Sequence, residues 1–529
     1  MEKRICVVGA GISGLAACKH LLDRGFRPTV FEAADSAGGV WVHTPASTRL
    51  QMARWDYQFS DFPWPETVTE VMPDNRQVLD YIQSYARRFD LLRHVRFGEK
   101  VAAVELVGVG EEEMETRDLW AGTGDAFGGR GGVWHVTVQH DDGTQKVHVM
   151  DFVILCIGRF SGLPNIPTFS LGKGPEVFKG KVIHSMDYSN MGSTAAAELI
   201  KGKKVIIIGF LKSALDIAAE CANLNGPKNP CTMIVRTKRW NINSLVIWGV
   251  PFQYLFFNRF SQLLFHKPGE GLLLSLLSTF LSPLAWIISK FVESYLKRTV
   301  PMKKYGMLPE HSFFQAMLSG LLSLLPDNFY GEVEKGSIVL KPSKAFEFCS
   351  RGVVVAGETE PVDADLVIFA TGFRGDQKLR NMFVSPLLQG MVAGSDETTV
   401  PLYRIYVALS RECIHPRIPQ MAIIGFSLSV MNMVTSEMSA RWLACFLDGG
   451  FQLPSVGCME KNVEEWEKHK KRYSGKAYRR SCINAFYIWY HDLLCRDMGC
   501  SPKRKKGFFA DLFIPYGPAD YAQLELKKK

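Results

Sequence analysis

The sequence predicts an α/β protein with two Rossmann-like domains, the second of which is inserted into the first. Residues 5–31 read as strand, glycine turn, helix and strand, and the same pattern returns over residues 204–235. An apolar run at residues 365–370 then has the character of a buried strand that returns to the first sheet. Two such units in this order predict that one domain interrupts the other.

These elements divide the chain into four segments. The first domain is expected to comprise residues 1–168 and 336–453, and the inserted domain residues 169–335. A helical tail is expected at residues 454–529. With 529 residues, the chain is long enough for several such units.

The residue pattern justifies each element of the first unit. Residues 5–8 form a continuous apolar run, as a parallel strand that is buried on both faces requires. Residues 12–24 carry apolar side chains at helical spacing, and residues 29–31 read as the second strand. Further along, residues 133–138 alternate apolar and polar side chains and are expected to pair in antiparallel fashion with residues 145–149.

The first glycine turn has the form GxGxxG. Its six residues are Gly9, Ala10, Gly11, Ile12, Ser13 and Gly14. The turn follows a buried strand, opens a helix and is followed by an acid, Glu32, at the end of the second strand, which predicts a dinucleotide cradle. Gly11 would let the backbone approach a pyrophosphate, while Glu32 would accept bonds from ribose hydroxyls and repel a 2′-phosphate. The cradle therefore fits FAD or NAD.

A second glycine pair follows Glu32 closely, in the segment GGVW. Its candidate cofactor-binding residues are Gly39, Val40 and Trp41. A glycine pair by itself is usually only a turn, but here it would let the backbone approach the rest of a long dinucleotide. This favours FAD over NAD.

The glycine turn of the second unit is degraded. Its residues are Gly209, Phe210, Leu211, Lys212, Ser213 and Ala214. Alanine is an accepted variant at the third glycine position, whereas Leu211 stands where close backbone approach is expected. The second strand ends in Arg236 rather than in an acid, and an arginine there accommodates a 2′-phosphate. The second cofactor is therefore expected to be NADPH, and the alternative is a solvated basic loop.

The composition argues against several other classes of protein. The net charge of +9 is modest for this length, so nucleic acid is not expected as a partner. The twelve cysteines form no CxxC pair, which predicts reduced thiols in a cytoplasmic protein and no metal site. Residues 271–289 carry no charge, but Pro283 interrupts them. We expect a buried or surface-docked helical hairpin there, with peripheral membrane contact and a true span as the alternatives.

A further motif lies between the two glycine turns, where residues 178–188 have the form FxGxxxHxxxY. Three other segments accompany it, and they are GGVW, Asp61-Phe62-Pro63 and Phe369-Ala370-Thr371-Gly372-Phe373. In this combination the chain resembles the flavin-containing monooxygenases from about residue 3 to residue 450. In detail it is most similar to the plant, defence-associated branch of that family.

The resemblance implies an enzyme in which NADPH reduces FAD and the reduced flavin takes up O2 as a C4a-hydroperoxide. That species would N-hydroxylate a small amine or cyclic amino acid, with pipecolic acid, a signal of systemic resistance in plants, as the expected substrate. Gln51 stands where many members have an asparagine and is the expected catalytic residue, since it would help to shape the oxygen pocket. The helix near residues 435–447 would point its N-terminus at the flavin.

Other readings of the same fold stay open. They are S-oxygenation of thioethers, oxidative decarboxylation of a keto acid, and a redox sensor that binds FAD without catalysis. The degraded turn at Leu211 is the feature that supports the sensor. Association with the surface of the endoplasmic reticulum is a further expectation, and the oligomeric state is left open.

Overall fold

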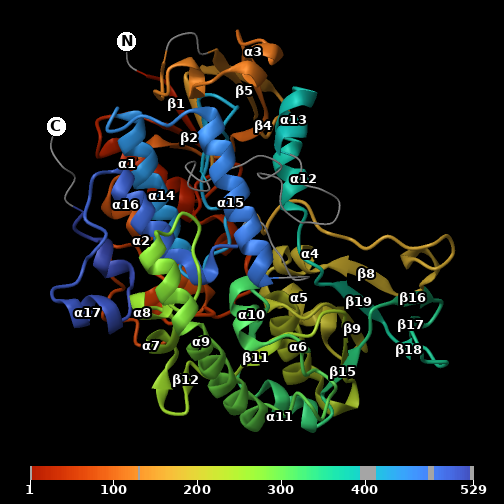
Figure 1. Cartoon of the computed structure of the whole chain (residues 1–529). Helices are drawn as coiled ribbons and strands as arrows, with labels where there is room; N and C mark the ends of the chain where they lie inside the picture. Colours follow the sequence, from red (N-terminus) through yellow and green to blue (C-terminus); the bar gives the residue numbers. More distant parts are fainter. Residues whose placement is uncertain (1–2, 129–131, 393–412, 475–481, 525–529) are drawn as a thin grey trace.

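The computed structural model describes residues 3–128, 132–392, 413–474 and 482–524. Its first sheet has five parallel strands in the order β20–β7–β1–β2–β3. Their bounds are β1 (Ile5–Val8), β2 (Thr29–Phe31), β3 (Val95–Arg96), β7 (Phe152–Leu155) and β20 (Met421–Ile423). The helix α1 (Ile12–Leu22) follows β1 and packs against α14 (Asn432–Leu447). Elements from the N-terminal part of the chain and from the part after residue 420 therefore build the first domain (Figure 1).

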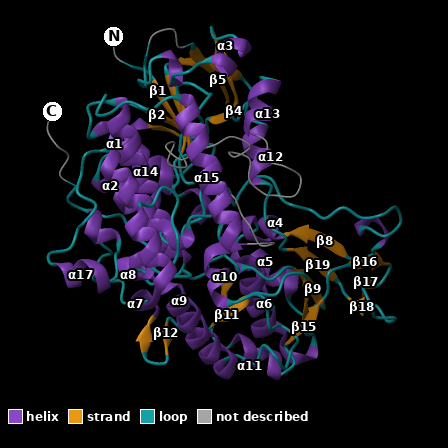
Figure 2. Cartoon of the chain, in the orientation of Figure 1, coloured by secondary structure: helices purple, strands orange, loops and turns teal. Residues whose placement is uncertain are grey.

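The second sheet also has five parallel strands, in the order β15–β10–β9–β19–β8. Their bounds are β8 (Lys181–His184), β9 (Val205–Ile208), β10 (Cys231–Val235), β15 (Ile338–Pro342) and β19 (Leu366–Phe369). The helix α6 (Lys212–Asn225) follows β9 and packs on β9 and β10. Figure 2 shows this sheet apart from the first, with helices around it. The two predicted Rossmann-like units are confirmed.

The prediction that residues 365–370 return to the first sheet is wrong. The strand β19 pairs with β9 and β8 and so lies in the second sheet. The strand that returns to the first sheet is β20, which pairs with β7. Both strands are short, fully buried apolar runs, and such a pattern does not reveal which partner a strand will have. The inserted unit consequently extends past the predicted boundary at residue 335, at least to Phe369.

Two short strand pairs, β11 (Trp240–Ile242) with β14 (Leu322–Leu324) and β12 (Val246–Ile247) with β13 (Val250–Pro251), and two three-stranded antiparallel sheets complete the strands. One comprises β4 (Lys100–Val107), β5 (Val133–Gln139) and β6 (Gln145–Met150), and it confirms the predicted antiparallel pair. The other comprises β16 (Phe346–Cys349), β17 (Gly352–Val355) and β18 (Val362–Asp363).

The apolar segment at residues 271–289 is part of one helix, not of a hairpin. The helix α9 (Leu272–Thr299) is 28 residues long and is not interrupted at Pro283. A proline removes the N–H that would bond the carbonyl four residues earlier. Here the hydroxyl of Ser282 donates to the carbonyl of Thr279 at 2.9 Å and replaces that lost bond. The polar residue beside the proline thus lets the helix continue.

The remaining helices connect and cover the two units. Those before α9 are α2 (Asn75–Arg88), α3 (Glu111–Thr116), α4 (Ser185–Asn190), α5 (Ser193–Ile200), α7 (Phe252–Phe256) and α8 (Arg259–Gln262). Those between α9 and α14 are α10 (Phe313–Ser319), α11 (Phe329–Glu334), α12 (Gly375–Arg380) and α13 (Pro386–Val392). The tail contains α15 (Val456–Ser474), α16 (Tyr487–Asp497) and α17 (Phe508–Phe513). Of these, α16 packs against α14 and so reaches back to the first domain.

Candidate functional site

The first glycine turn is held tightly between two strands. Gly9 has a φ of +103°, a conformation that favours glycine, and its N–H donates to the carbonyl of Phe31 at 2.7 Å. A Cβ on Gly9 would lie 2.7 Å from the carbonyl oxygen of Cys156, directly after the neighbouring strand β7. A Cβ on Gly14 would lie 1.8 Å from the carbonyl oxygen of Gly9. Both glycines are therefore required by the packing of β1, β7 and α1.

The GGVW segment rests directly on this turn. The N–H of Gly38 donates to the carbonyl of Ala10 at 3.1 Å. A Cβ on Gly11 would lie 3.3 Å from the Cα of Gly39. Gly11 is the N-cap of α1 and makes no side-chain cap, so the first N–H groups of the helix are left for a ligand. The turn and the helix end fit the pyrophosphate of a dinucleotide.

Glu32 lies beside the turn, as its position after β2 predicts. Its carboxylate accepts from the N–H of Ala10 at 2.6 Å and from the N–H of Ala34 at 2.9 Å. These two bonds fix the carboxylate while its remaining lone pairs stay available to ribose hydroxyls. A fixed negative charge at this point also disfavours a 2′-phosphate. The first cradle therefore fits FAD.

The second glycine turn has the same backbone form. Gly209 has a φ of +137°, and a Cβ there would lie 2.3 Å from the carbonyl oxygen of Ala370. Leu211 is the N-cap of α6, as Gly11 is of α1, and its backbone is extended at φ −114°. Any residue adopts that conformation, so leucine brings no backbone strain. The side chain of Leu211 is 42% exposed.

The other residues of the second turn differ in their surroundings. Ala214 is fully buried at the start of α6, whereas Ser213 is exposed. The side chain of Phe210 is buried and its ring packs against Phe329. The ammonium of Lys212 lies 2.7 Å from a carboxylate oxygen of Asp216. Lys212 thus forms an ion pair with Asp216 within α6. Its predicted contact with the second cofactor stays a prediction.

Arg236 is exposed immediately after β10, where a 2′-phosphate would be held. Arg239, three residues later, is buried and donates to the carbonyl of Gly320 at 3.0 Å. Of these two arginines, Arg236 is therefore the one whose side chain is exposed and could bind a phosphate.

Replacing Arg236 by alanine is expected to raise the KM for NADPH about 10- to 100-fold, because a charge-assisted contact is lost. The KM for NADH should change little, since NADH has no 2′-phosphate. Steady-state kinetics with both donors would measure the two effects. Arg351→Ala, at another exposed arginine, is the matched control and should leave both values unchanged. Equal losses with NADPH and NADH would contradict a 2′-phosphate contact.

The loop after GGVW joins the two cradles. The hydroxyl of Thr48 donates to a carboxylate oxygen of Asp216 at 2.7 Å, and the hydroxyl of Ser47 bonds to Glu220. Asp216 and Glu220 belong to α6, the helix that the second glycine turn opens. Burial raises the pKa of Asp216 although Lys212 and Thr48 oppose the shift. These contacts, which lie far apart in the sequence, bring the flavin cradle to the NADPH cradle.

The histidine of the FxGxxxHxxxY motif caps a helix. The Nδ1 atom of His184 accepts from the N–H of Met186 at 3.1 Å, and the N–H of His184 donates to Asp187 at 3.0 Å. Tyr188, at the end of the motif, donates to Glu220 at 2.5 Å. The motif thus orders α4 and ties it to the junction between the cradles.

Gln51 lies three residues after Thr48 in the same loop. Its side chain is exposed, while Leu50 and Ala53 on either side are buried. The buried neighbours anchor the loop and leave the side chain of Gln51 exposed. Its role in an oxygen pocket stays a prediction.

The contacts that brace α14 join distant segments and were not predicted from the sequence. The hydroxyl of Ser436 lies 3.2 Å from that of Ser13 in the first glycine turn, so α14 begins beside the flavin cradle. The helix α16 of the tail also contacts α14. The Nε2 atom of His491 lies 3.1 Å from the hydroxyl of Thr435, and the hydroxyl of Tyr490 lies 3.0 Å from that of Ser439. Residues beyond the two Rossmann-like units therefore help to position the start of α14 at the flavin cradle.

A buried ion pair fixes the same helix from its other side. Glu437 is fully buried and accepts from the N–H of Ser60 at 2.7 Å, from the hydroxyl of Ser60 at 2.6 Å and from Arg441 at 2.6 Å. Although burial raises the pKa of Glu437, Arg441 and the hydrogen bonds lower it to about 2. Glu437 therefore stays charged and ties α14 to the loop that leads from Gln51.

Comparison with known proteins agrees with this geometry. A family model described as flavin-binding monooxygenase-like matches residues 2–519. A probable flavin-containing monooxygenase 1 of Arabidopsis thaliana is 42% identical over 98% of this chain and 96% of the relative. Flavin-containing monooxygenase 1 of Homo sapiens is 27% identical over 99% of this chain and 89% of the relative.

Solved structures show the same fold. The complex of OTEMO with FAD and NADP has a TM-score of 0.65 at 18% identity and covers 93% of this chain and 98% of that one. S-allyl-L-cysteine S-oxygenase from Allium sativum has a TM-score of 0.57 at 19% identity and covers 94% of this chain and 89% of that one. The cofactors of this chain are FAD and NADPH, as the two cradles require. The chain belongs to the flavin-containing monooxygenase family.

Proposed function

We propose that this monooxygenase N-hydroxylates a small amine or a cyclic amino acid, with pipecolic acid as the expected substrate. One oxygen atom of O2 enters the new N–O bond and the other leaves as water, while NADPH supplies two electrons as a hydride and a proton is consumed. The observation that carries the proposal is the junction of Thr48 with Asp216, which joins an NADPH cradle to a flavin cradle. The choice of substrate rests on the resemblance to the plant, defence-associated branch.

The protein's part in this reaction is to bind and to orient. FAD supplies the hydride acceptor and the activation of oxygen when it is bound. Gly11 and Gly39 admit its pyrophosphate, and Glu32 holds its ribose. Arg236 holds the 2′-phosphate of NADPH. The contacts of Ser47 and Thr48 with α6 hold the two cradles together.

The proposal is tested by incubating the purified holoenzyme with pipecolate and NADPH in air and analysing the product by mass spectrometry. A product with one added oxygen atom on nitrogen, formed in proportion to the NADPH consumed, is expected. The rate should increase with pH, because only the unprotonated amine has a free lone pair. Unchanged pipecolate, with NADPH turnover stimulated by another substrate, would contradict N-hydroxylation of this amino acid.

A second candidate reaction is S-oxygenation of a thioether. Its support is the likeness to the S-allyl-L-cysteine S-oxygenase from Allium sativum, which at this identity reflects the fold alone. The same assay with S-allyl-L-cysteine separates the two reactions, because a sulfoxide forms at sulfur whatever the protonation of the amine. A rate that does not change across the titration of the substrate amine would therefore favour the thioether reaction.

Replacing Gln51 by alanine is expected to divert part of the NADPH oxidation to hydrogen peroxide. The loss of one hydrogen-bonding side chain predicts a change of about 2- to 10-fold in the ratio of peroxide to product. Gln51→Asn keeps the amide and should restore most of the coupling. Gln145→Ala, at an exposed glutamine of β6, is the control. An unchanged ratio in Gln51→Ala would remove Gln51 from the oxygen pocket.

A further inference from the structure

Two segments cross between the two large sheets, and they run side by side. The first leaves β7 for the inserted unit, and the second returns after β19. The N–H of Asn165 donates to the carbonyl of Gly372 at 2.9 Å, and the N–H of Arg374 donates to the carbonyl of Leu163 at 2.9 Å. Because these bonds run once in each direction, the two crossings form a short antiparallel connection between the units.

The helix α12 follows the second crossing and is fastened to the first crossing by Lys378. The ammonium of Lys378 donates to the carbonyl of Ile157 at 2.6 Å and to the hydroxyl of Ser161 at 3.2 Å. A Cβ on Gly162 would lie 3.3 Å from the Cε of Lys378, so the stem of the lysine packs against the backbone of the first crossing. One side chain therefore holds both crossings together beside the end of β7.

The carbonyl of Ile157 borders the flavin cradle. In the first sheet β1 and β7 are neighbours, with β2 on the far side of β1 and β20 on the far side of β7. Open α/β sheets bind their ligands at such a point, where the order of the strands reverses. The N–H of Cys156 donates to the carbonyl of Val8 at 2.9 Å, directly before the glycine turn. Lys378, which is bonded to the residue after Cys156, thus lies at the same edge of the sheet as that turn.

Lys378 is half-buried, and its two hydrogen-bond partners, Ile157 and Ser161, offer neutral oxygens. These bonds use two of the three N–H groups of the ammonium, and no carboxylate forms an ion pair with it within the described part of the chain. Burial lowers the pKa of Lys378 to about 8, while the negative charge of Glu32 opposes the shift and Lys100 adds to it. An anion beside the ammonium would therefore stabilise its charged form. The pyrophosphate is the anionic part of FAD.

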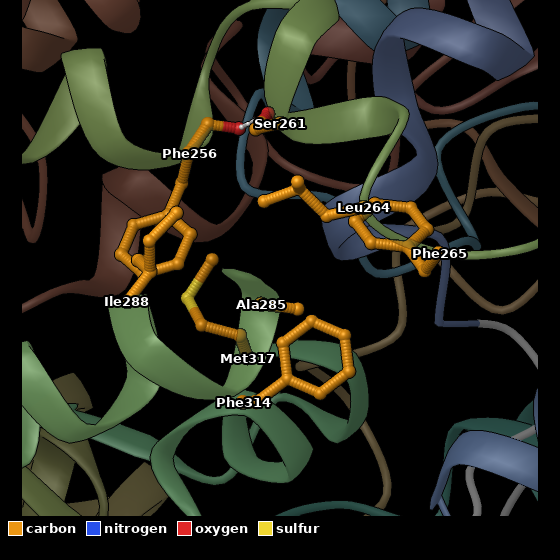
Figure 3. Close-up of a pocket in the computed structure, with 8 residues that line it drawn as sticks. All are labelled: Phe256, Ser261, Leu264, Phe265, Ala285, Ile288, Phe314 and Met317. Carbon is orange, nitrogen blue, oxygen red and sulfur yellow. Dashed lines mark hydrogen bonds between the residues drawn. The ribbon is translucent and has the colours of Figure 1, made fainter. Parts of the chain in front are cut away.

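A cavity in the inserted unit contains no comparable charge. Figure 3 shows this cavity between α7, α8, α9 and α10, and the one polar side chain that lines it is Ser261, whose hydroxyl donates to the carbonyl of Phe256 at 2.9 Å. The other lining side chains are all apolar. An apolar cavity whose polar group already has a partner does not attract an anion. Lys378 is therefore the better candidate for a contact with a charged cofactor.

We propose that Lys378 binds FAD through an ion pair between its ammonium and the pyrophosphate of the cofactor, and that this contact ties the two crossings to the flavin cradle. Lysine is a common ligand of phosphate groups. With FAD bound, the third N–H of Lys378 would donate to a phosphate oxygen, while the other two keep their bonds to Ile157 and Ser161. The flavin site would thus include a residue that follows the inserted unit, and this role is independent of the substrate.

Release of FAD from the full-length holoenzyme tests this contact. The holoenzyme is diluted, and the rise of free-flavin fluorescence gives the dissociation rate. Lys378→Met keeps the apolar stem but removes the charge, and it should release FAD about 10- to 100-fold faster than wild type. Added salt should accelerate release from wild type more than from Lys378→Met, because salt screens the ion pair. Lys335→Met, at an exposed lysine directly after α11, is the control and should behave as wild type does.

Two more variants separate the ion pair from a purely structural brace. Lys378→Gln keeps an N–H donor for the carbonyl of Ile157 without the charge, and it should release FAD as fast as Lys378→Met does. Ser161→Ala removes only a neutral hydrogen bond of the crossing and should change the rate about 3-fold or less. Circular dichroism confirms that each variant is folded. The proposal is overturned if Lys378→Met or Lys378→Gln releases FAD at the rate of wild type, or if salt affects wild type and Lys378→Met equally.

A measurement on wild type alone tests the tie to the crossings. Amide hydrogen exchange is compared between the holoenzyme and the same protein after FAD has been removed. The amides of residues 157–165 and 371–380 should exchange more slowly when FAD is bound, because its pyrophosphate would hold Lys378 and both crossings with it. Equal exchange in the two states would overturn the tie, and this result does not depend on how well the variants of Lys378 fold.

Discussion

Replacing Gly11 by valine is expected to yield a folded but colourless protein. The Cβ of the new side chain would lie 3.3 Å from the Cα of Gly39, and its methyl groups would crowd the first N–H groups of α1. These N–H groups are the ones expected to bind the pyrophosphate of FAD. Overpacking of this kind costs about 3 kcal/mol, which corresponds to a ~100-fold weaker affinity for FAD. The ratio of flavin absorbance to protein absorbance, before and after FAD is added, measures the loss.

The control for this experiment is another glycine. Gly110 has open space around its Cα and a φ of −74°, so Gly110→Val should keep its yellow colour. Gly11→Ala adds a single carbon and should show an intermediate loss. Circular dichroism and the apparent Tm of the apoprotein distinguish a lost cofactor from a lost fold. A Gly11→Val protein that retains stoichiometric FAD would mean that the turn does not hold the pyrophosphate.

Replacing Arg441 by methionine is expected to destabilise the flavin domain by about 3–5 kcal/mol, because a buried carboxylate would lose its partner. Arg441 lies 2.6 Å from Glu437 and also donates to the hydroxyl of Ser60 and to the carbonyl of Tyr521, both at 2.6 Å. The guanidinium thus joins α14, the loop after Gln51 and the tail. Urea unfolding followed by flavin fluorescence measures the loss.

The matched control is the exposed ion pair of Arg24 with Asp448, whose atoms lie 2.9 Å apart. Arg24→Met should cost no more than about 1 kcal/mol, because solvent screens such a pair. In the double variant Arg441→Met/Glu437→Gln the buried charge is gone, so part of the lost stability should return. Equal and small effects of Arg24→Met and Arg441→Met would contradict a structural role for the buried pair.

The same pair sets a dependence on pH. The pKa of Glu437 is about 2 in the folded protein, against about 4.3 in an unfolded chain. Its stabilising contribution is therefore complete above about pH 4.3 and is lost as the pH falls toward about 2. Without Arg441 the folded pKa rises, so acid unfolding of Arg441→Met should begin at a higher pH than that of wild type.

Local patterns predicted the two cradles well. The turn from Gly9 to Gly14 and the acid Glu32 lie within one βαβ unit, where the spacing along the chain fixes the spacing in space. The same holds for Arg236 after β10. The helix α9 shows the limit of such patterns, because Pro283 suggested a break that the hydroxyl of Ser282 prevents.

Contacts between distant segments could not be predicted in this way. The strand β19 has the same apolar character as a strand of either sheet, and only its pairing with β9 assigns it to the second. The brace of His491 on Thr435 joins residues that are 56 positions apart in the chain, a separation over which local patterns do not predict a contact. Thr48 and Asp216 are ordinary residues whose role arises from the fold. The sequence therefore predicted which cofactors bind, but not the contacts that join the two cradles.

The pairing of β20 with β7 has a consequence for synthesis on the ribosome. The second sheet uses only strands from Lys181 to Phe369, so all of it emerges as one uninterrupted stretch of nascent chain. The first sheet begins at Ile5 but cannot be completed before Met421 has been synthesised. The contact that braces α14 also requires His491. Because domains generally fold as units while they emerge, the inserted unit should be complete while the flavin unit is still open. Holoenzyme assembly would then be a late event, governed by release of the C-terminal residues.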